Sequence, residues 1–486
     1  ADSGTLWAPQ GEHDDALPLA PLSQRSFALA ATDGDNAGMP TSNRVLRAST
    51  PKFRALPLRA LVFATAVAGV MLAAVAYADH GNANRYDLKP TAIAQVAGPS
   101  VPIDLFQSDT RFTKQSTAGS VEPDLEQVLI GTRSLRVSTD GDAQQVNLRA
   151  SNLSPLDLSQ QFLRLNLKIK GLAHLDYLTI YLSGDGFETY DSFPVVVGGV
   201  NPANTYADED DWFTITAGLG STVAGAPPSI DLASVTDVQL SIKDDGKEAV
   251  TAWLDSLEAV ALPPRGKVSL VFDDARDGVF DFALPLAQRL GLKASIAVIV
   301  DLIGQPSFMT VDQLRVAERF AGWEVIAHHL TPLEAGGFDT LASDDLAAEL
   351  TGVKTWLLEQ GFQRGSEVIA YPYGGFNEAS IALVREYFAA GRTIVRSQGM
   401  ETWPPADPYR LRAVSVVPSD SPAVLNALID RAAEERTWLI VVFHQVYPQG
   451  SEFDTYYYTE DLASVLTHVA AADVDVVLLS EALFGR

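Results

Sequence analysis

Four short segments of this sequence, called strings below, contain the polar side chains that could take part in catalysis. They are, in chain order, Val271–Asp274, Ala327–His329, Ala370–Gly374 and Val442–His444. The first and the last end apolar runs typical of buried parallel strands, and polar residues that follow such strands point into an active-site mouth. Adjacent carboxylates at Asp273 and Asp274 would repel each other unless a proton or a cation intervened. Paired carboxylates with separated histidines therefore indicate metal-assisted hydrolysis.

The elements that must position these strings alternate in type from Lys267 onward. Apolar runs predict strands at 268–272, 294–300, 323–326, 368–370, 393–395, 438–443 and 474–479. Helical periodicity predicts helices at 281–290, 344–360, 378–389, 422–435 and 460–470. Repeated strand–helix units predict a parallel sheet, and this pattern leaves open whether the sheet is closed into a barrel.

The order and wording of the four strings resemble the polysaccharide deacetylase domain (NodB-homology domain, carbohydrate esterase family 4) from about Arg265 to Arg486. The resemblance implies a distorted (β/α)7 barrel over 264–486 and hydrolysis of an amide bond in a polysaccharide. It also implies a divalent metal, zinc or a similar ion, because Asp and His ligands suit such ions.

The resemblance further implies one role for each matching residue. Asp273 matches the general base of the family, and Asp274 matches the carboxylate ligand of the metal. His328 matches the first histidine ligand. Tyr373 matches the position whose backbone N–H stabilises the oxyanion, and His444 matches the general acid that protonates the leaving amine.

This sequence departs from the family pattern at three positions. Pro332 stands four residues after His328, where the family has its second histidine ligand, so His329 is the remaining candidate for that ligand. Ala370 stands where an arginine often precedes the Pro-Tyr string, and Ala275 stands where the first string usually has glycine. We therefore expect the metal to be held weakly or to be absent.

Each of these residues also has a purely structural interpretation. Asp273 and Asp274 could cap the end of a strand, and His328, His329 and His444 could be hydrogen-bonded residues of the core. A further string, 407–411, matches a loop of the family that is expected to orient catalytic groups. Four other histidines have no supporting context and are interpreted as non-functional: His13, His80, His174 and His468.

The middle region, 103–263, is predicted to be an antiparallel β-sandwich of the jelly-roll type. Residues 161–170 alternate apolar and polar side chains, which is typical of a strand with one buried face. Similar runs occur at 177–182, 212–216, 238–242 and 251–260, separated by turn residues. Such a sandwich resembles, by pattern only, the carbohydrate-binding jelly rolls that often precede glycan-active domains. Pro263-Pro264 marks its boundary with the next domain.

Two groups of residues in this region have two interpretations each. Four aromatic residues could form a platform for sugars or could belong to the core: Tyr181, Tyr190, Trp212 and Trp253. The acidic run 208–211 could bind calcium or could be a solvated turn, and we favour the turn.

The N-terminal region predicts a membrane anchor. The nineteen residues 60–78 carry no charge, and as a helix they would reach about 28 Å, enough to cross the hydrocarbon layer. Arginines and a lysine precede them, which places the N-terminus in the cytoplasm. We expect a flexible cytoplasmic tail at 1–57, a single transmembrane signal-anchor helix at 58–79 and a linker at 80–102. The alternatives are a cleaved leader and a buried core helix.

Composition excludes several classes of function. The net charge of −26 argues against a nucleic-acid partner, and the absence of cysteine excludes disulfides and thiolate chemistry. We therefore expect a deacetylase of N-acetylated polysaccharide, anchored in the inner membrane with its main domains periplasmic or extracellular. One alternative is a catalytically inactive module that binds glycan. The other is an accessory structural subunit of a larger membrane complex.

Overall fold

A computed structural model describes residues 86–94, 98–197, 209–333, 336–394, 400–448 and 455–485. The expected tail at 1–57 and the expected anchor at 58–79 lie outside these residues. Among the helices that are described, none combines the length and the apolar character that crossing a membrane requires.

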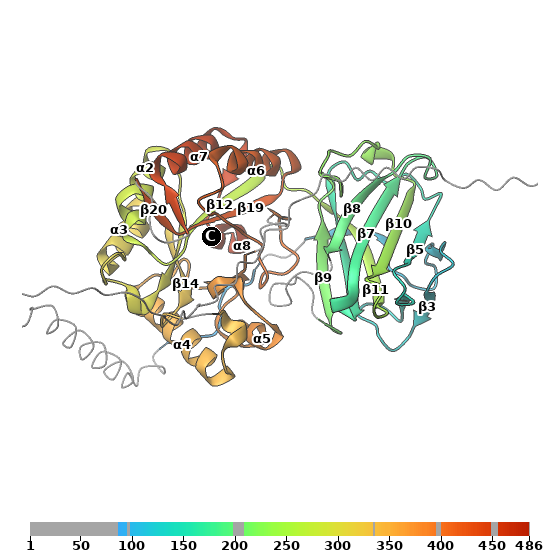
Figure 1. The fold of residues 1–486 in the computed structure, drawn as a ribbon, viewed down its shortest axis with the longest axis horizontal. Helices are drawn as coiled ribbons and strands as arrows, with labels where there is room; N and C mark the ends of the chain where they lie inside the picture. The colour runs from blue at the N-terminus through green and yellow to red at the C-terminus, as the bar shows by residue number, and fades with distance from the viewer. Residues whose placement is uncertain are drawn as a thin grey trace, which may run out of the picture. The chain divides into compact units, whose positions relative to one another are not determined.

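The middle region is a sandwich of two antiparallel sheets, seen on the right in Figure 1. The first sheet has the order β3 (Ser120–Asp124), β4 (Ser134–Ser138), β11 (Thr251–Ala261), β6 (Gln161–Lys170) and β9 (Trp212–Ala217), and β1 (Ser100–Asp104) pairs with β11. The second sheet has the order β2 (Thr113–Lys114), β5 (Gln145–Ala150), β10 (Asp237–Asp244), β7 (Leu175–Ser183) and β8 (Asp191–Val197). Two short 3-10 turns, η1 (Leu172–His174) and η3 (Leu232–Ser234), lie in the connections.

Apolar and polar side chains alternate along the strands of this sandwich, as predicted, so that each sheet has one buried face. In β6, Leu165, Leu167 and Ile169 are buried, whereas Arg164 and Lys168 are only half-buried on the other face. Leu240 of β10 sits in register with Leu148 of β5 and Ile180 of β7, and all three face the common core. The strand predicted at 161–170 is confirmed residue for residue.

The aromatic residues of the sandwich divide between core and surface. Trp253 is buried, and its indole nitrogen donates to Asp124 at 2.9 Å, so it is a structural residue. Tyr181 and Trp212 are half-buried, whereas Tyr190 is 55% exposed. In the acidic run, the Glu209 carboxylate accepts the backbone N–H groups of Gly171 and Leu172 at 2.7 Å, as expected for a turn residue.

The C-terminal domain contains a sheet of nine described strands in the order β16 (Ala390–Arg392), β15 (Val368–Ala370), β14 (Glu324–His329), β13 (Ser295–Ile299), β12 (Gly266–Phe272), β19 (Trp438–Phe443) and β17 (Met400–Glu401). In addition, β18 (Val414–Ser415) pairs with β19, and β22 (Val474–Val476) pairs with β12. All of these pairings are parallel except that of β17 with β19. A separate pair is formed by β20 (Gln445–Tyr447) and β21 (Tyr456–Tyr458).

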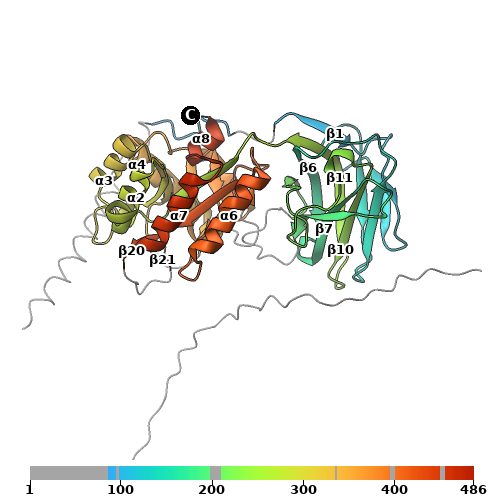
Figure 2. The same cartoon turned by 90° about the horizontal axis from the view of Figure 1, so that it is seen from above.

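Helices cover the outer face of this sheet (Figure 1, Figure 2). They are α2 (Leu284–Arg289), α3 (Val311–Ala321), α4 (Ser343–Gln360), α5 (Glu378–Tyr387), α6 (Pro422–Glu435) and α7 (Thr459–Ala471). A π-helical turn, η4 (Val279–Ala283), precedes α2, and short 3-10 turns lie at η5 (Val300–Leu302), η6 (Phe338–Thr340) and η7 (Pro372–Gly374). By contrast, α8 (Leu479–Phe484) packs against Val271 and Ile326 on the inner face.

The central strands are buried on both faces, which is why they read as unbroken apolar runs. In β12, Leu270 and Phe272 face the helices, whereas Val271 faces the interior. The sheet curls into a half-barrel, so the expectation of a distorted (β/α)7 barrel is confirmed only as a curled parallel sheet with outer helices. The backbone N–H of Leu411 donates to the carbonyl of Gly391, which extends the curl beyond β16.

One predicted strand is misplaced. The sequence predicts a strand at 393–395, but β16 is Ala390–Arg392, and residues 393 and 394 lie outside it. The backbone of Gly391, placed in register with Ile369, bonds to Pro408 and Leu411, so pairing with neighbours defines this strand rather than β-branched residues. The predicted strand 474–479 also ends early, because Leu479 begins α8.

Candidate active site

The polar strings meet at the carboxyl ends of the parallel strands. Phe272 of β12 is in register with Phe443 of β19, so Asp273 and His444 follow neighbouring strands side by side. The backbone N–H of Asp273 donates to the carbonyl of Phe443 at 2.8 Å, which continues the ladder by one step. His328 and His329 are the last two residues of β14. The geometry therefore brings the first, second and fourth strings to one edge of the sheet.

Asp273 is bound by an arginine that the sequence analysis missed. Nη2 of Arg392, the last residue of β16, lies 2.7 Å from both carboxylate oxygens of Asp273. Arg392 is fully buried and Asp273 is 1% exposed. Burial alone would raise the pKa of Asp273, but the positive charge of the adjacent Arg392 guanidinium outweighs burial and lowers this pKa. The carboxyl group is therefore held ionised and in one orientation.

His444 faces the same carboxylate from the other side of β12. Its Nε2 lies 4.0 Å from Oδ2 of Asp273. Its Nδ1 is buried and has no hydrogen-bond partner among the described residues. One ring nitrogen of His444 thus faces Asp273, and the other makes no hydrogen bond to the described backbone.

Asp274 lies in a sharp turn of the backbone. Asp274 and Ala275 have φ values of 68° and 53°, so two successive residues adopt the left-handed conformation. This conformation favours glycine, which gives a physical reason for the glycine that the family usually has at the second position. The Asp274 carboxylate lies 3.8 Å from Nε2 of His328 and 3.5 Å from Nε of Arg276.

Both histidines of β14 have one ring nitrogen fixed by the backbone. Nδ1 of His328 donates to the carbonyl of Ala370 at 2.8 Å, and Nδ1 of His329 donates to the carbonyl of Thr331. The neutral His328 ring therefore carries its lone pair on Nε2, the nitrogen that faces Asp274. Burial lowers the pKa of both rings, that of His329 to about 3, so both are neutral near pH 7.

A local irregularity of β14 brings the two rings together. Val298 and Ile299 of β13 pair with Ala327 and His329, so His328 is an extra residue in the register. In a regular strand adjacent side chains point to opposite faces, but here the two ring centroids are 4.7 Å apart at 63°. His329 therefore lies beside the first expected ligand, as a substitute ligand must.

The donor set fits a divalent cation only in part. Asp274 and His328 offer a carboxylate and an unprotonated imidazole nitrogen, which are donors that zinc accepts. Pro332 is exposed and cannot be a ligand. In the described part of the chain, no group of three or more His, Cys, Asp or Glu residues could hold a metal ion. These residues thus fit a metal site that has two protein ligands and binds its ion weakly. His329 is the nearest candidate for a third ligand.

The loop that carries Pro332 is fixed from α4. The carboxylate of Glu349 accepts the backbone N–H groups of Leu330 and Thr331 at 2.7 and 3.1 Å. Glu349 also accepts the hydroxyl of Thr331. Because these bonds hold the chain just before Pro332, a residue at 332 has a defined backbone position.

Tyr373 projects from the turn after β15. It has φ 55° and ψ 10°, its side chain is 63% exposed, and its hydroxyl donates to the carbonyl of Leu333 at 3.1 Å. No acceptor for its backbone N–H exists among the described residues. A free N–H at this position is what an oxyanion donor requires. Tyr371, in contrast, is buried and donates to the carbonyl of Tyr409 at 2.8 Å.

The remaining predicted residues are not part of this group. The 407–411 loop supports β16, because the backbone of Gly391 bonds to Pro408 and Leu411. His174 contacts Asp245 at 3.3 Å, and His468 contacts Asp430 at 2.7 Å, both near the surface. The two histidines at positions 13 and 80 lie outside the described residues.

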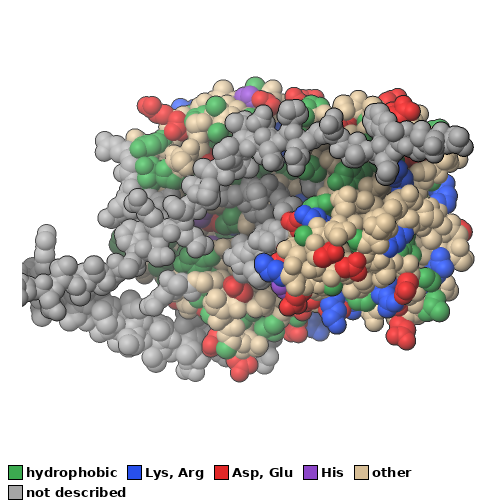
Figure 3. Space-filling view, turned by 45° about the vertical axis from the view of Figure 1, so that its right-hand side comes forward, with side chains coloured by type: hydrophobic (Ala, Val, Ile, Leu, Met, Phe, Trp, Pro, Cys, Tyr) green, Lys and Arg blue, Asp and Glu red, His purple; other side chains and the backbone are tan. Residues whose placement is uncertain are grey.

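Figure 3 shows charged side chains of both signs on one face of the molecule. On that face Lys and Arg side chains are scattered among Asp and Glu side chains rather than gathered into one basic patch. The excess of 61 acidic over 35 basic residues agrees with this distribution.

Comparison with known proteins gives one curated relative and several structural likenesses, while no family model matches. A Bacillus subtilis (strain 168) protein named "Putative polysaccharide deacetylase YxkH" is 27% identical over 197 residues, which are 39% of this chain and 66% of that protein. This chain thus spans slightly less than two thirds of that relative.

Two solved structures illustrate the structural likenesses. The Streptococcus pyogenes deacetylase PplD in complex with acetate has 22% identity over 32% of this chain and 67% of its own, with a TM-score of 0.28. A carbohydrate-binding module of the β-sandwich superfamily has 17% identity over 33% of this chain and 61% of its own, with a TM-score of 0.24. TM-scores below 0.5 do not establish a shared fold.

Proposed function

We propose that this chain, whose residues from about 265 onward resemble the polysaccharide deacetylases of carbohydrate esterase family 4, removes acetyl groups from an N-acetylated polysaccharide. The observation that carries the proposal is the buried Asp273 carboxylate. It is held by Arg392 on one side and faced by His444 on the other, beside the pair Asp274 and His328.

Asp273 and His444 each carry out one of the two proton transfers of amide hydrolysis. Asp273, ionised at neutral pH, accepts the proton of the attacking water. His444 donates a proton to the leaving nitrogen when the tetrahedral intermediate collapses. The free backbone N–H of Tyr373 stabilises the negative oxygen of that intermediate. A divalent cation such as zinc, held by Asp274 and His328, would supply Lewis acidity to the same site.

Acetate release from N-acetylated chitooligosaccharides tests this proposal. We expect turnover by the parent chain, and a loss of at least 100-fold in Asp273→Asn and in His444→Ala. His468→Ala is the matched control, because His468 also contacts an aspartate, 2.7 Å away, but lies on the surface of α7. No acetate from the parent with zinc added would reject the proposal.

The same proposal includes a membrane location. It is supported by the uncharged residues 60–78 and the basic residues before them, which are typical of an inner-membrane anchor with the main domains outside. Fractionation of cells that express the whole chain tests this. Recovery of the chain in the soluble fraction after lysis would contradict it.

A second function is favoured by the exposed Pro332 and by the absence, among the described residues, of a three-ligand group. In this alternative the domain binds the glycan without cleaving it. Glycan binding that chelators leave unchanged, with no acetate released, would support the alternative. Turnover that chelators abolish would reject it.

A further inference from the structure

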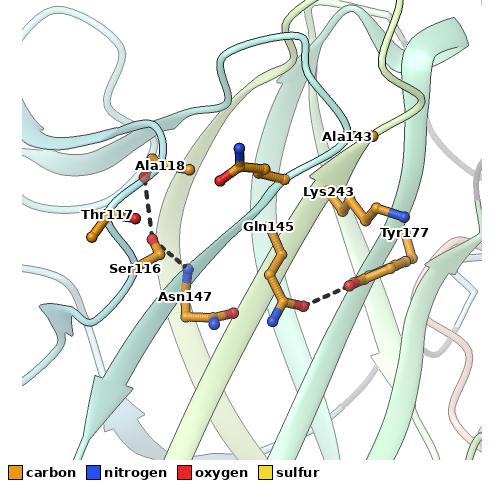
Figure 4. Close-up of a pocket in the computed structure, with 9 residues that line it drawn as sticks. Ser116, Thr117, Ala118, Ala143, Gln145, Asn147, Tyr177 and Lys243 are labelled. Carbon is orange, nitrogen blue, oxygen red and sulfur yellow. Dashed lines mark hydrogen bonds between the residues drawn. The ribbon is translucent and has the colours of Figure 1, made fainter. Parts of the chain in front are cut away.

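The second sheet of the sandwich carries a polar pocket on its outer face, shown in Figure 4. Its volume is about 410 Å³, within the range of pockets that hold small ligands. Strands β5, β7 and β10 supply its floor, and the segments 116–118 and 143–144 supply its walls. The lining is Ser116, Thr117, Ala118, Ala143, Gln144, Gln145, Asn147, Tyr177 and Lys243. None of these residues belongs to the candidate active site.

The register of the strands aligns the floor of the pocket. Lys243 of β10 pairs with Gln145 of β5 on one side and with Tyr177 of β7 on the other. Side chains two residues apart on a strand share a face, so Asn147 extends the same surface. Val146, the residue between Gln145 and Asn147 on β5, points the other way and is buried in the core. The sheet thus presents an amide, an ammonium and an aromatic ring in one row.

The lining offers hydrogen-bond donors that the protein does not use. The hydroxyl of Tyr177 donates to Oε1 of Gln145 at 2.6 Å, which leaves the amide nitrogen of Gln145 open. Ser241 donates to Oδ1 of Asn147 at 2.6 Å, which leaves that amide nitrogen open too. Neither nitrogen, nor the hydroxyl of Thr117, has a partner among the described residues. Open amide and hydroxyl groups match a ligand that is rich in hydroxyl groups.

The charge of the pocket indicates a ligand without net charge. Lys243 is the one ionisable cation in the lining, and its ammonium is already paired with Asp176 at 2.8 Å. The ammonium also lies 5.6 Å from the centre of the Tyr177 ring. An anionic ligand would find no unpaired cation there, whereas a neutral one would keep the existing pair.

From this combination we infer that the outer face of β5, β10 and β7 is a binding site for a neutral, hydroxyl-rich glycan chain. Tyr177 offers its half-buried ring to the C–H face of a sugar, and the amides of Gln145 and Asn147 bond to its hydroxyl groups. The choice of an N-acetylated polysaccharide as that glycan rests on the proposed function. The site itself rests on the pocket.

Affinity electrophoresis of the full chain tests the site. The gel contains glycol chitin, a soluble and uncharged N-acetylated polymer, and every variant carries Asp273→Asn so that the polymer is not consumed. We expect about tenfold weaker retention for Tyr177→Ala and for the double change Gln145→Ala with Asn147→Ala. Tyr177→Phe keeps the ring and loses only one hydrogen bond, so its retention should stay within about threefold of the parent.

The first sheet supplies a matched control. Lys168 of β6 is paired with Asp210 at 3.0 Å and lies 5.5 Å from the ring centre of Trp253, which repeats the arrangement of Lys243, Asp176 and Tyr177. Lys168→Ala should therefore retain the binding of the parent. If Lys168→Ala lost the retention instead, the glycan would lie on the other sheet and the inference would be wrong.

Two further results would overturn the inference. One is unchanged retention of Tyr177→Ala and of the double variant, with a thermal transition that shows both are folded. The other is stronger retention by polygalacturonate than by glycol chitin that is lost in 0.5 M salt, which would show an anionic ligand. Failure of the deacetylase proposal is separate, because it is measured as acetate release by the parent and not as retention.

Discussion

The Nη2 atom of Arg392 lies 2.7 Å from both carboxylate oxygens of Asp273. The other two guanidinium nitrogens are buried without a hydrogen-bond partner among the described residues. A buried cation with a single anionic partner is fixed by that partner, and it fixes the partner in return. Arg392 is thus a positioning residue for the carboxylate to which we assign proton transfer. It comes from β16, not from position 370, where the family often has its arginine.

We predict that Arg392→Lys lowers kcat by about 100-fold, because an ammonium cannot hold both oxygens of Asp273 in one orientation. The pKa of Asp273 is lowered by Arg392, so a weaker pair should let this pKa rise. The base is active only when ionised, and the acid limb of the pH–rate profile should therefore move to higher pH. Steady-state kinetics between pH 4 and pH 9 measures both effects.

Arg412→Lys is the control for this change. Arg412 is also buried and pairs with a buried carboxylate, that of Glu401, at 2.9 and 3.1 Å. It should lower the thermal transition without moving the acid limb. Equal shifts of the limb in both variants would show that the Arg392 effect is a general loss of packing.

The sequence predicts the strands that bear Asp273 and His444 because those strands are buried on both faces. A strand of this kind must be a continuous apolar run, and the polar residue that follows it must lie at the sheet edge. Both conditions depend only on neighbouring residues in the sequence. The strand ends at Val271–Asp274 and Val442–His444 can therefore be recognised from the sequence alone. Helical periodicity is also a local signal, and it gives α6 with both of its ends.

The sequence does not identify Arg392 as a residue of the site, because β16 has no local sequence pattern that marks it as a strand. Its three residues, Ala390, Gly391 and Arg392, have low strand preference, and the β-branched residues that suggest a strand come just after them. The contact between the rings of His328 and His329 could not be predicted from the sequence either, because it depends on the register of β13 against β14. Non-local pairing decides both features.

We predict that Pro332→His strengthens zinc binding by at least tenfold. Glu349 holds the backbone of Leu330 and Thr331, so a histidine at 332 would stand on a fixed chain four residues after His328, whose Nε2 lone pair faces Asp274. A third protein ligand adds binding energy that two ligands lack. Isothermal titration of the chelator-treated chain with zinc gives the affinity.

The control for this variant is Pro332→Gln, which has a polar side chain of similar reach and is a poorer zinc ligand. Asp274→Asn combined with Pro332→His should lose the gain, because the carboxylate ligand is removed. A tight, stoichiometric zinc ion in the parent chain would contradict the prediction and would mean that another residue already completes the site.

We predict that Arg436→Gly stabilises the C-terminal domain by about 1 kcal/mol. Arg436 ends α6 with φ 52° and ψ 42°, a left-handed conformation that costs a residue with a Cβ atom more than it costs glycine. Its backbone N–H donates to the carbonyl of Ala432, a bond that glycine keeps. Urea denaturation measures the change, and Arg431→Gly, inside the same helix, should destabilise instead.

The last prediction concerns Glu324, a buried carboxyl at the start of β14, four residues before His328. Its Oε1 accepts the Ser295 hydroxyl at 2.6 Å and the Ser480 N–H at 3.3 Å, but its Oε2 is buried without a partner among the described residues. Burial raises the pKa of Glu324 above its ordinary value of 4.5. The folded state therefore prefers the protonated form, and the charge destabilises the fold as pH rises through the interval between the unfolded and folded pKa values.

Glu324→Gln should remove this penalty, because the amide fills the same space without a charge. We expect a gain of about 1–3 kcal/mol in the free energy of unfolding at pH 8, and no gain at pH 4, where the glutamate is already protonated in the folded state. Glu349→Gln is the control, since Glu349 uses both oxygens as acceptors, and it should destabilise at pH 8. A gain from Glu324→Gln that is equal at both pH values would show that packing, not charge, is responsible.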